Sequence, residues 1–297
     1  MNKIGFEKLN FDQNQDLYFS RFFFFTFILY LFYSHKVSIY SDISGILFNP
    51  TFVYKWLGFP RPQINFIEIL KQIWLVLIFF SAIGFLTRIS VITSFIIGFY
   101  ILGLDWAFYY SNHQYQTLII CWGILAFSNS GQAISVDSKI TKNKKWTNES
   151  GFLKLAQGAV CAMYFIAAIS KIRHSGIHFF TLENSKLIMA LSKEWFGNRT
   201  ELQIFFEQTL MQNNFLLAAG IFFSFASEIL CPLALILKSK MRYIFILNCI
   251  ALQILVYLFL NISFLKMAPV FIFWIPWAEI GNKFLGWLFV VCGIRWK

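Results

Sequence analysis

The chain has 297 residues, of which 58% are hydrophobic and only 13% are charged, and its formal net charge is +11. Soluble domains average about 45–50% apolar and about 25% charged residues, so this composition excludes an ordinary soluble domain. The basic residues gather in short segments between apolar runs, which is typical of membrane proteins and argues against nucleic-acid binding.

Eight apolar runs follow one another along the chain. Several contain 18 or more nearly uncharged residues, the length that a helix needs to cross a hydrocarbon layer about 30 Å thick. We therefore expect an all-α fold, a polytopic transmembrane helical bundle with about eight crossings. The runs cover residues 19–34, 66–86, 89–110, 115–132, 152–172, 214–237, 243–264 and 267–280.

The last run and the residues after it differ from the others. The run at 267–280 is short and contains Pro269 and Pro276, so we expect a broken or tilted helix there. Residues 281–297 mix aromatic and aliphatic side chains with basic ones, a pattern typical of a segment in the membrane interface. The expected domains are a transmembrane domain over 1–280 and a short amphipathic tail over 281–297.

Short basic segments set the expected orientation. Arg21, Arg88 and the basic clusters at 139–145 and 238–242 all lie inside if the N-terminus is cytoplasmic, as the positive-inside rule expects. The segments at 35–65, 111–114 and 173–213 are then outside loops, and the two long ones are of mixed charge. The first sixteen residues are polar and no small-residue cleavage site follows the first run, so we expect no cleavable signal peptide. We expect a multi-pass protein that is located in the bacterial cytoplasmic membrane and has the lipid bilayer as its partner.

Three polar residues interrupt the apolar runs. Lys171 ends the run at 152–172, where it either extends its amine to the headgroups or faces the bundle as a general base. Glu228 lies within the run at 214–237, and intramembrane acids usually have a partner inside the bundle. The alternative for Glu228 is a purely structural hydrogen bond. Gln253 is a milder case of the same kind.

A polar turn, Asn112-His113, separates two apolar runs and lies on the same expected side of the bilayer as Lys171. We expect these three side chains to meet in one dry chamber near the outer leaflet. The alternative is a structural turn in which Asn112 caps the following helix. No His, Cys or Asp cluster has metal-ligand spacing, since Gly176 weakens any helix that joins His174 to His178, and we expect no metal site.

Two strings resemble the vitamin K-dependent γ-glutamyl carboxylases. The first is Asn112-His113-Gln114-Tyr115 followed by Ser135-Val136-Asp137, and the second runs over 164–172 with its lysine in register. These carboxylases belong to the horizontally transferred transmembrane (HTTM) superfamily, and the resemblance covers roughly residues 10–280. In size the chain is similar to short bacterial HTTM proteins, including the sporulation-delaying-protein B family, which matures a secreted peptide toxin.

The resemblance implies that Lys171 deprotonates a lipid quinol, such as vitamin K hydroquinone or a menaquinol, beside Asn112 and His113. The quinol anion then reacts with oxygen to give a strong base, which removes a proton from a glutamate γ-carbon so that carbon dioxide adds. Gln253 stands near the position where the family usually has a histidine. The expected substrate- or cofactor-binding residues are Tyr115, Tyr164, Glu228 and Gln253.

Three functions stay open on the sequence. The first is a quinol-dependent enzyme, a γ-carboxylase-like lyase or monooxygenase, acting on a small secreted peptide or protein. The second is a non-catalytic membrane module for the maturation or export of such a peptide. The third, a transporter, predicts inverted repeats and helices broken near the midplane, and only the run at 267–280 is broken.

Overall fold

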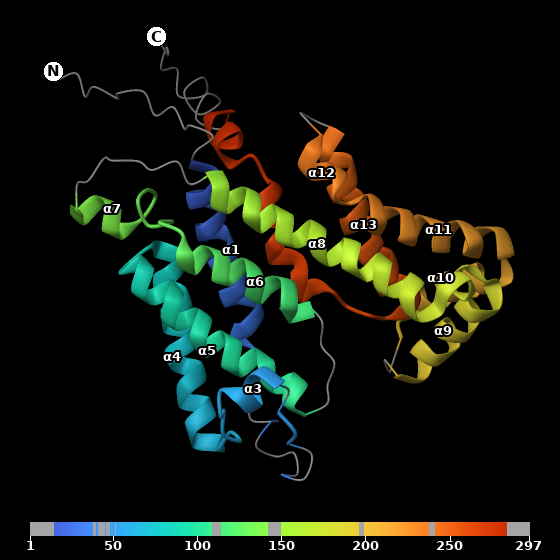
Figure 1. Ribbon diagram of the computed structural model, residues 1–297, viewed down its shortest axis with the longest axis horizontal. Helices are drawn as coiled ribbons and strands as arrows, with labels where there is room; N and C mark the ends of the chain where they lie inside the picture. Colours follow the sequence, from blue (N-terminus) through green and yellow to red (C-terminus); the bar gives the residue numbers. More distant parts are fainter. Residues whose placement is uncertain are drawn as a thin grey trace. The chain divides into compact units, whose positions relative to one another are not determined.

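The computed structural model describes residues 15–37, 40, 45, 48–50, 52–108, 114–141, 150–195, 199–237 and 241–283. The regular secondary structure of these residues is helical throughout, so the expected all-α class is confirmed (Figure 1). The chain divides into two compact units, the first made of Met1–Ala156 with Ile275–Lys297 and the second of Gln157–Trp274. Of the expected C-terminal tail, only residues 281–283 are described.

In the first unit, α1 packs on α4, α4 on α5, and α5 on α6 (Figure 1). A short helix, α3, precedes α4, and another, α7, follows α6. The bounds are Asp16–Tyr33 for α1, Phe52–Trp56 for α3, Ile64–Ile83 for α4, Thr87–Ala107 for α5, Gln114–Phe127 for α6 and Val136–Thr141 for α7.

Two buried tryptophans hold α4, α5 and α6 together. The rings of Trp74 and Trp122 stack with centroids 5.8 Å apart. Both indole N–H groups donate to Ser94 of α5, Trp74 to its carbonyl oxygen at 2.9 Å and Trp122 to its hydroxyl at 3.3 Å. A buried indole N–H left without an acceptor is costly, so these bonds fix which faces of the three helices meet.

The sequence places Arg21 among the basic residues on the inner side of the membrane, but the structure does not place it in a surface loop. It lies within α1 and is fully buried, with no part of its side chain exposed. Its guanidinium donates to the carbonyl oxygens of Ser81 at 3.3 Å and Ile134 at 2.5 Å. A buried guanidinium needs such hydrogen-bond partners. Because these carbonyl oxygens are distant in sequence, counting the basic residues could not predict that Arg21 is buried.

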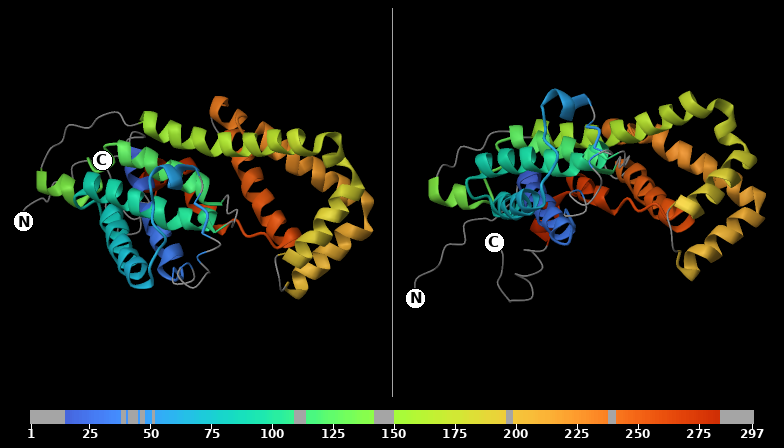
Figure 2. Two further views of the ribbon diagram at one scale, coloured as in Figure 1. Left: turned by 60° about the horizontal axis from the view of Figure 1, so that its bottom comes forward. Right: turned by 90° about the horizontal axis from the view of Figure 1, so that it is seen from below.

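The second unit contains most of α8, then η3, α9, α10, α11, α12, α13 and η4. Helix α13 contacts α9, α10, α11, α12 and η4. Helices α10 and α11 meet at a bend of 105°, which Figure 2 shows as a sharp corner. The bounds are Ser150–Ser175 for α8, Gly176–Phe180 for η3, Leu182–Trp195 for α9, Glu201–Gln212 for α10, Asn214–Leu230 for α11, Leu233–Ile236 for α12, Met241–Leu260 for α13 and Leu265–Trp274 for η4.

Five helical segments among the described residues are long and apolar enough to cross a membrane. The bent pair α10 and α11 passes the same test only when the two helices are taken together, and α6 and η4 are apolar but shorter. Helix η4 is a 3-10 helix that continues through Pro269, and the last run is interrupted after it, at Ile275 and Pro276. The five segments are Asp16–Tyr33, Ile64–Ile83, Thr87–Asp105, Ser150–Phe180 and Met241–Leu260.

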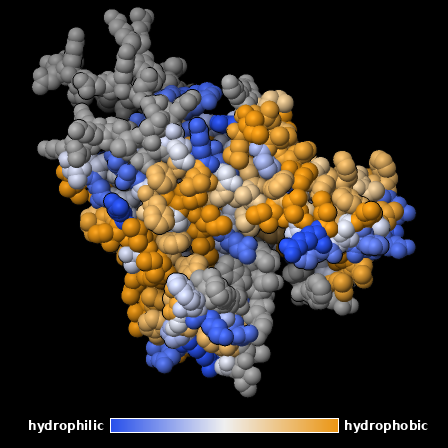
Figure 3. All heavy atoms as spheres, viewed as in Figure 1, coloured by the Kyte–Doolittle hydropathy of each residue, from blue (hydrophilic) through white to orange (hydrophobic). Residues whose placement is uncertain are grey.

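The outer face of α4 is apolar, and the surface over this helix is coloured as hydrophobic in Figure 3. Ile69, Ile73 and Val76 recur at helical spacing and are 62%, 48% and 52% exposed. A contiguous apolar stripe of this kind is rare on the water-facing surface of a soluble protein. It fits a helix whose outer side contacts lipid.

Candidate functional site

An ion pair joins two helices of the second unit. The Nζ atom of Lys171 on α8 lies 2.6 Å and 2.7 Å from the two carboxylate oxygens of Glu228 on α11. The side chain of Lys171 is 29% exposed and that of Glu228 is 9% exposed. Two of the residues selected from the sequence are therefore direct partners, and Lys171 reaches toward a neighbouring helix.

Helix α11 places two polar side chains on one face. It begins at Asn213, whose side-chain oxygen accepts from the backbone N–H groups of Phe215 and Leu216, each at 3.1 Å. Ser224 and Glu228 are four residues apart, a spacing that brings side chains to the same side of a helix. Lys171 Nζ lies 3.2 Å from the Ser224 hydroxyl as well as against Glu228.

Aromatic rings border this polar group. The ammonium of Lys171 lies 5.3 Å from the centroid of the Phe179 ring, within the range of a cation–π contact. Phe225 of α11 contacts both Phe179 and Phe180, at centroid distances of 6.5 Å and 5.1 Å. The site is thus an amine, a carboxylate and a hydroxyl beside an apolar aromatic wall.

A second polar contact in the same unit joins the other selected residues. The amide nitrogen of Gln253 on α13 donates to the hydroxyl of Tyr164 on α8. Tyr164 is buried, while Gln253 is half-buried. This hydrogen bond gives each of the two side chains a polar partner and links α8 to α13.

The remaining selected residues belong to the first unit. Tyr115 is fully buried and packs against Phe32, with ring centroids 5.8 Å apart. Asn112 and His113 lie outside the described residues. The expected meeting of Lys171, Asn112 and His113 in one chamber therefore stays a prediction.

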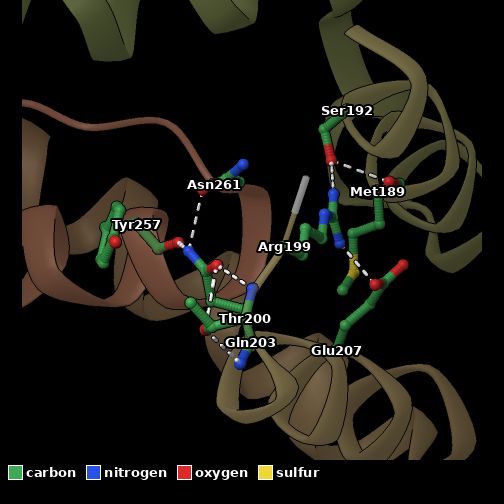
Figure 4. Close-up of polar contacts among 8 residues, drawn as sticks. All are labelled: Met189, Ser192, Arg199, Thr200, Gln203, Glu207, Tyr257 and Asn261. Carbon is green, nitrogen blue, oxygen red and sulfur yellow. Dashed lines mark hydrogen bonds and ion pairs between the residues drawn. The ribbon is translucent and has the colours of Figure 1, made fainter. Parts of the chain in front are cut away.

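A buried polar network lies where α9, α10 and α13 meet, and Figure 4 shows its members. Arg199 pairs with Glu207 and also donates to the Ser192 hydroxyl at 2.8 Å. Gln203 of α10 donates to the carbonyl oxygen of Tyr257 at 3.0 Å and to the side chain of Asn261 at 2.9 Å. The network fastens the connection before α10 to the rest of the second unit.

Sequence reasoning missed Ser224 and the Arg199–Glu207 pair. The position of Ser224 four residues before Glu228 was a usable signal, because an intramembrane acid points to the helix face around it. The second pair had no such signal, since residues 173–213 read as a loop of mixed charge. Within the described ranges, no three His, Cys, Asp or Glu side chains are grouped to hold a metal ion.

The arrangement around Lys171 is suited to proton transfer. An amine in contact with a carboxylate can pass a proton along an existing hydrogen bond, and the same amine donates a second hydrogen bond to the hydroxyl oxygen of Ser224. In comparisons with known proteins, no family model matches this chain, and neither a curated protein nor a solved structure matches it significantly.

Proposed function

We propose that this chain is a multi-pass integral membrane enzyme in which Lys171, paired with Glu228, acts as a base on a lipid-soluble quinol. The proposal keeps the HTTM, carboxylase-like assignment of the sequence and the bacterial cytoplasmic membrane as the location. The single observation that carries it is the contact of the Lys171 amine with both oxygens of Glu228, between helices of high apolar content.

The proposed topology has eight crossings and a cytoplasmic N-terminus. The five long spans supply five crossings, and α6, α11 and η4 supply the other three, with α10 lying before the crossing that α11 makes. A contact in the first unit supports the shared side of two basic segments: Asp137 accepts from the backbone N–H groups of Leu86 and Thr87, at 2.8 Å and 2.7 Å. This joins the turn before Arg88 to the helix that carries Lys139.

The proposed base needs an acceptor for the proton that an ammonium carries. Glu228 provides one at hydrogen-bond distance, and moving the proton to it leaves a neutral amine beside a neutral acid. The neutral amine of Lys171 is then a competent general base.

The residues present fit a flat phenolic group. Phe179, Phe180 and Phe225 offer aromatic faces, and Lys171 and Ser224 offer polar atoms beside them. A bound quinol supplies a weakly acidic hydroxyl and, with oxygen, the oxidising chemistry of the resembling carboxylases. The chain's own contribution is to orient the hydroxyl, to keep water away from it and to remove its proton.

The test is oxygen-dependent consumption of a menaquinol by the purified full chain in lipid vesicles. We expect Lys171→Arg to reduce the rate by about 100-fold or more, because arginine keeps the positive charge but cannot give up its proton. Lys186→Ala is the matched control, since Lys186 lies in the same unit and bonds to Asn214 at 2.9 Å. Full activity in Lys171→Arg would contradict the proposal.

The second candidate function is a non-catalytic membrane module for the maturation or export of a small secreted peptide. One observation favours it: the segment that the sequence left as an outer loop contains η3, α9 and α10, held in place by the network around Arg199. An ordered surface of this kind suits a peptide partner. Under this function Lys171→Arg leaves peptide maturation intact, whereas loss of the Arg199–Glu207 pair impairs it.

A further inference from the structure

The Lys171 amine contacts a second group, Ser224, to which the proposed quinol chemistry gives no covalent role. Its Nζ atom lies 3.2 Å from the hydroxyl oxygen of Ser224, while Glu228 holds the same nitrogen at 2.6 Å and 2.7 Å. Ser224 is half-buried and Lys171 is 29% exposed, so neither side chain is closed off inside the unit. The three side chains form a chain of contacts from hydroxyl to amine to carboxylate.

This order of groups is the pattern of an activated serine. A nucleophile within hydrogen-bond reach of a base, with the base oriented by a third group, defines covalent catalysis by serine, and lysine replaces histidine in some of these sites. We infer that Ser224 is a nucleophile for acyl transfer, activated by Lys171 and oriented through Glu228. The inference rests on the proposed role of Lys171 as a base but names a different reaction of that base.

The reaction balances without an oxidant or a cofactor. The neutral amine of Lys171 takes the hydroxyl proton as the Ser224 oxygen bonds to a substrate carbonyl carbon. The carbon–nitrogen or carbon–oxygen bond of the substrate then breaks, and the leaving group takes the proton from Lys171. Water next attacks the Ser224 ester, giving one proton to the amine, which returns it to the Ser224 oxygen. The net change is hydrolysis of one amide or ester bond.

The surroundings indicate the class of substrate. Phe179, Phe180 and Phe225 form an apolar border at ring distances of 5.1 to 6.5 Å, and Ser224 lies on a helix that is itself apolar. A charged substrate would lose hydration against these rings, and the Lys171 amine and the Glu228 carboxylate beside them are already paired with each other. The substrate class that fits is an ester or peptide bond with hydrophobic groups on both sides.

The test uses the purified full chain in detergent with an alkyl fluorophosphonate, a probe that bonds covalently to activated serines, followed by peptide mass spectrometry. We expect labelling at Ser224, no labelling of that peptide in Ser224→Ala, and labelling at least about 100-fold slower in Lys171→Arg. Ser227→Ala is the matched control, because Ser227 lies three residues along the same helix and is buried. Labelling in this control equals that of the unsubstituted chain.

The outcomes separate this inference from the proposed quinol chemistry. Thermal unfolding is measured first, to show that each variant is folded. Lys171→Arg is used because arginine keeps a cation beside Glu228 and so preserves the ion pair. If Ser224 is unlabelled, or is labelled equally fast in Lys171→Arg, the inference is overturned while menaquinol consumption is unaffected. If Ser224 is labelled and Lys171→Arg still consumes menaquinol at full rate, the quinol proposal fails and the nucleophile stands.

Discussion

Lys171 and Glu228 lie 57 residues apart in sequence, yet the amine of one contacts both carboxylate oxygens of the other within 2.7 Å. The contact joins the polar last turns of α8, where Arg173 and His174 follow Lys171, to the apolar helix α11. Ionic partners in such surroundings are stable only together, because each one alone keeps the full cost of its lost hydration. The pair is therefore a structural element as well as the candidate chemical site.

The first prediction concerns this mutual dependence. Glu228→Leu leaves the Lys171 ammonium without its counter-ion and should lower the free energy of unfolding by about 1–3 kcal/mol. The expected loss is below the 3–5 kcal/mol typical of a fully buried pair, since Lys171 is 29% exposed. Thermal unfolding in detergent measures it. The double variant Lys171→Met with Glu228→Leu should recover most of the loss, and a double variant less stable than either single one would refute the coupling.

The second prediction concerns the pair that holds α10. The side chains of Arg199 and Glu207 are only 4% and 11% exposed, so Glu207→Gln leaves a buried guanidinium without its anion. We expect a loss of about 3–5 kcal/mol, or early cleavage near α10 by an added protease. Glu201→Gln, on the exposed side of the same helix, should change stability by less than about 0.5 kcal/mol. Equal effects of the two substitutions would argue against the network.

The third prediction concerns the turn between α4 and α5. Gly84 has φ of +71°, and a Cβ atom there would lie 2.1 Å from a guanidinium nitrogen of Arg21 and 2.3 Å from Cβ of Ser135. Gly84→Ala should therefore cost more than the roughly 1–2 kcal/mol of the backbone strain alone. Gly158→Ala in α8 meets nothing within 4 Å and should instead gain about 0.5–1 kcal/mol. The unfolding temperatures of the two variants should move in opposite directions.

The fourth prediction concerns the proposed topology. Cysteines introduced at Arg88 and Lys139 should resist a membrane-impermeant maleimide in intact cells and react once the membrane is opened. A cysteine at Glu201 should react in intact cells, because residues 173–213 are proposed to lie outside. The unsubstituted chain gives the background labelling. Reaction of the cysteines at 88 and 201 from the same side would exclude the proposed arrangement.

Composition and the spacing of apolar runs were enough to predict the helical class and the positions of the long helices. Runs of this length can satisfy their backbone polar groups in lipid only as helices, which makes the prediction physical and independent of tertiary contacts. The same reasoning identified Glu228 as an acid in need of a partner. It also predicted an interruption of the last run, which lies at Ile275 and Pro276, between η4 and the helical residues 277–283.

The tertiary structure alone decided which polar groups meet. Nothing in the residue order distinguished a Lys171 that extends toward headgroups from one that contacts Glu228, because the choice depends on which face of α11 packs beside α8. The burial of Arg21 followed in the same way from the carbonyl oxygens of Ser81 and Ile134, which are distant in sequence. Hydropathy along the chain determines which segments must be removed from water. The pairing of the polar atoms within them depends on contacts between segments, which the order of residues does not contain.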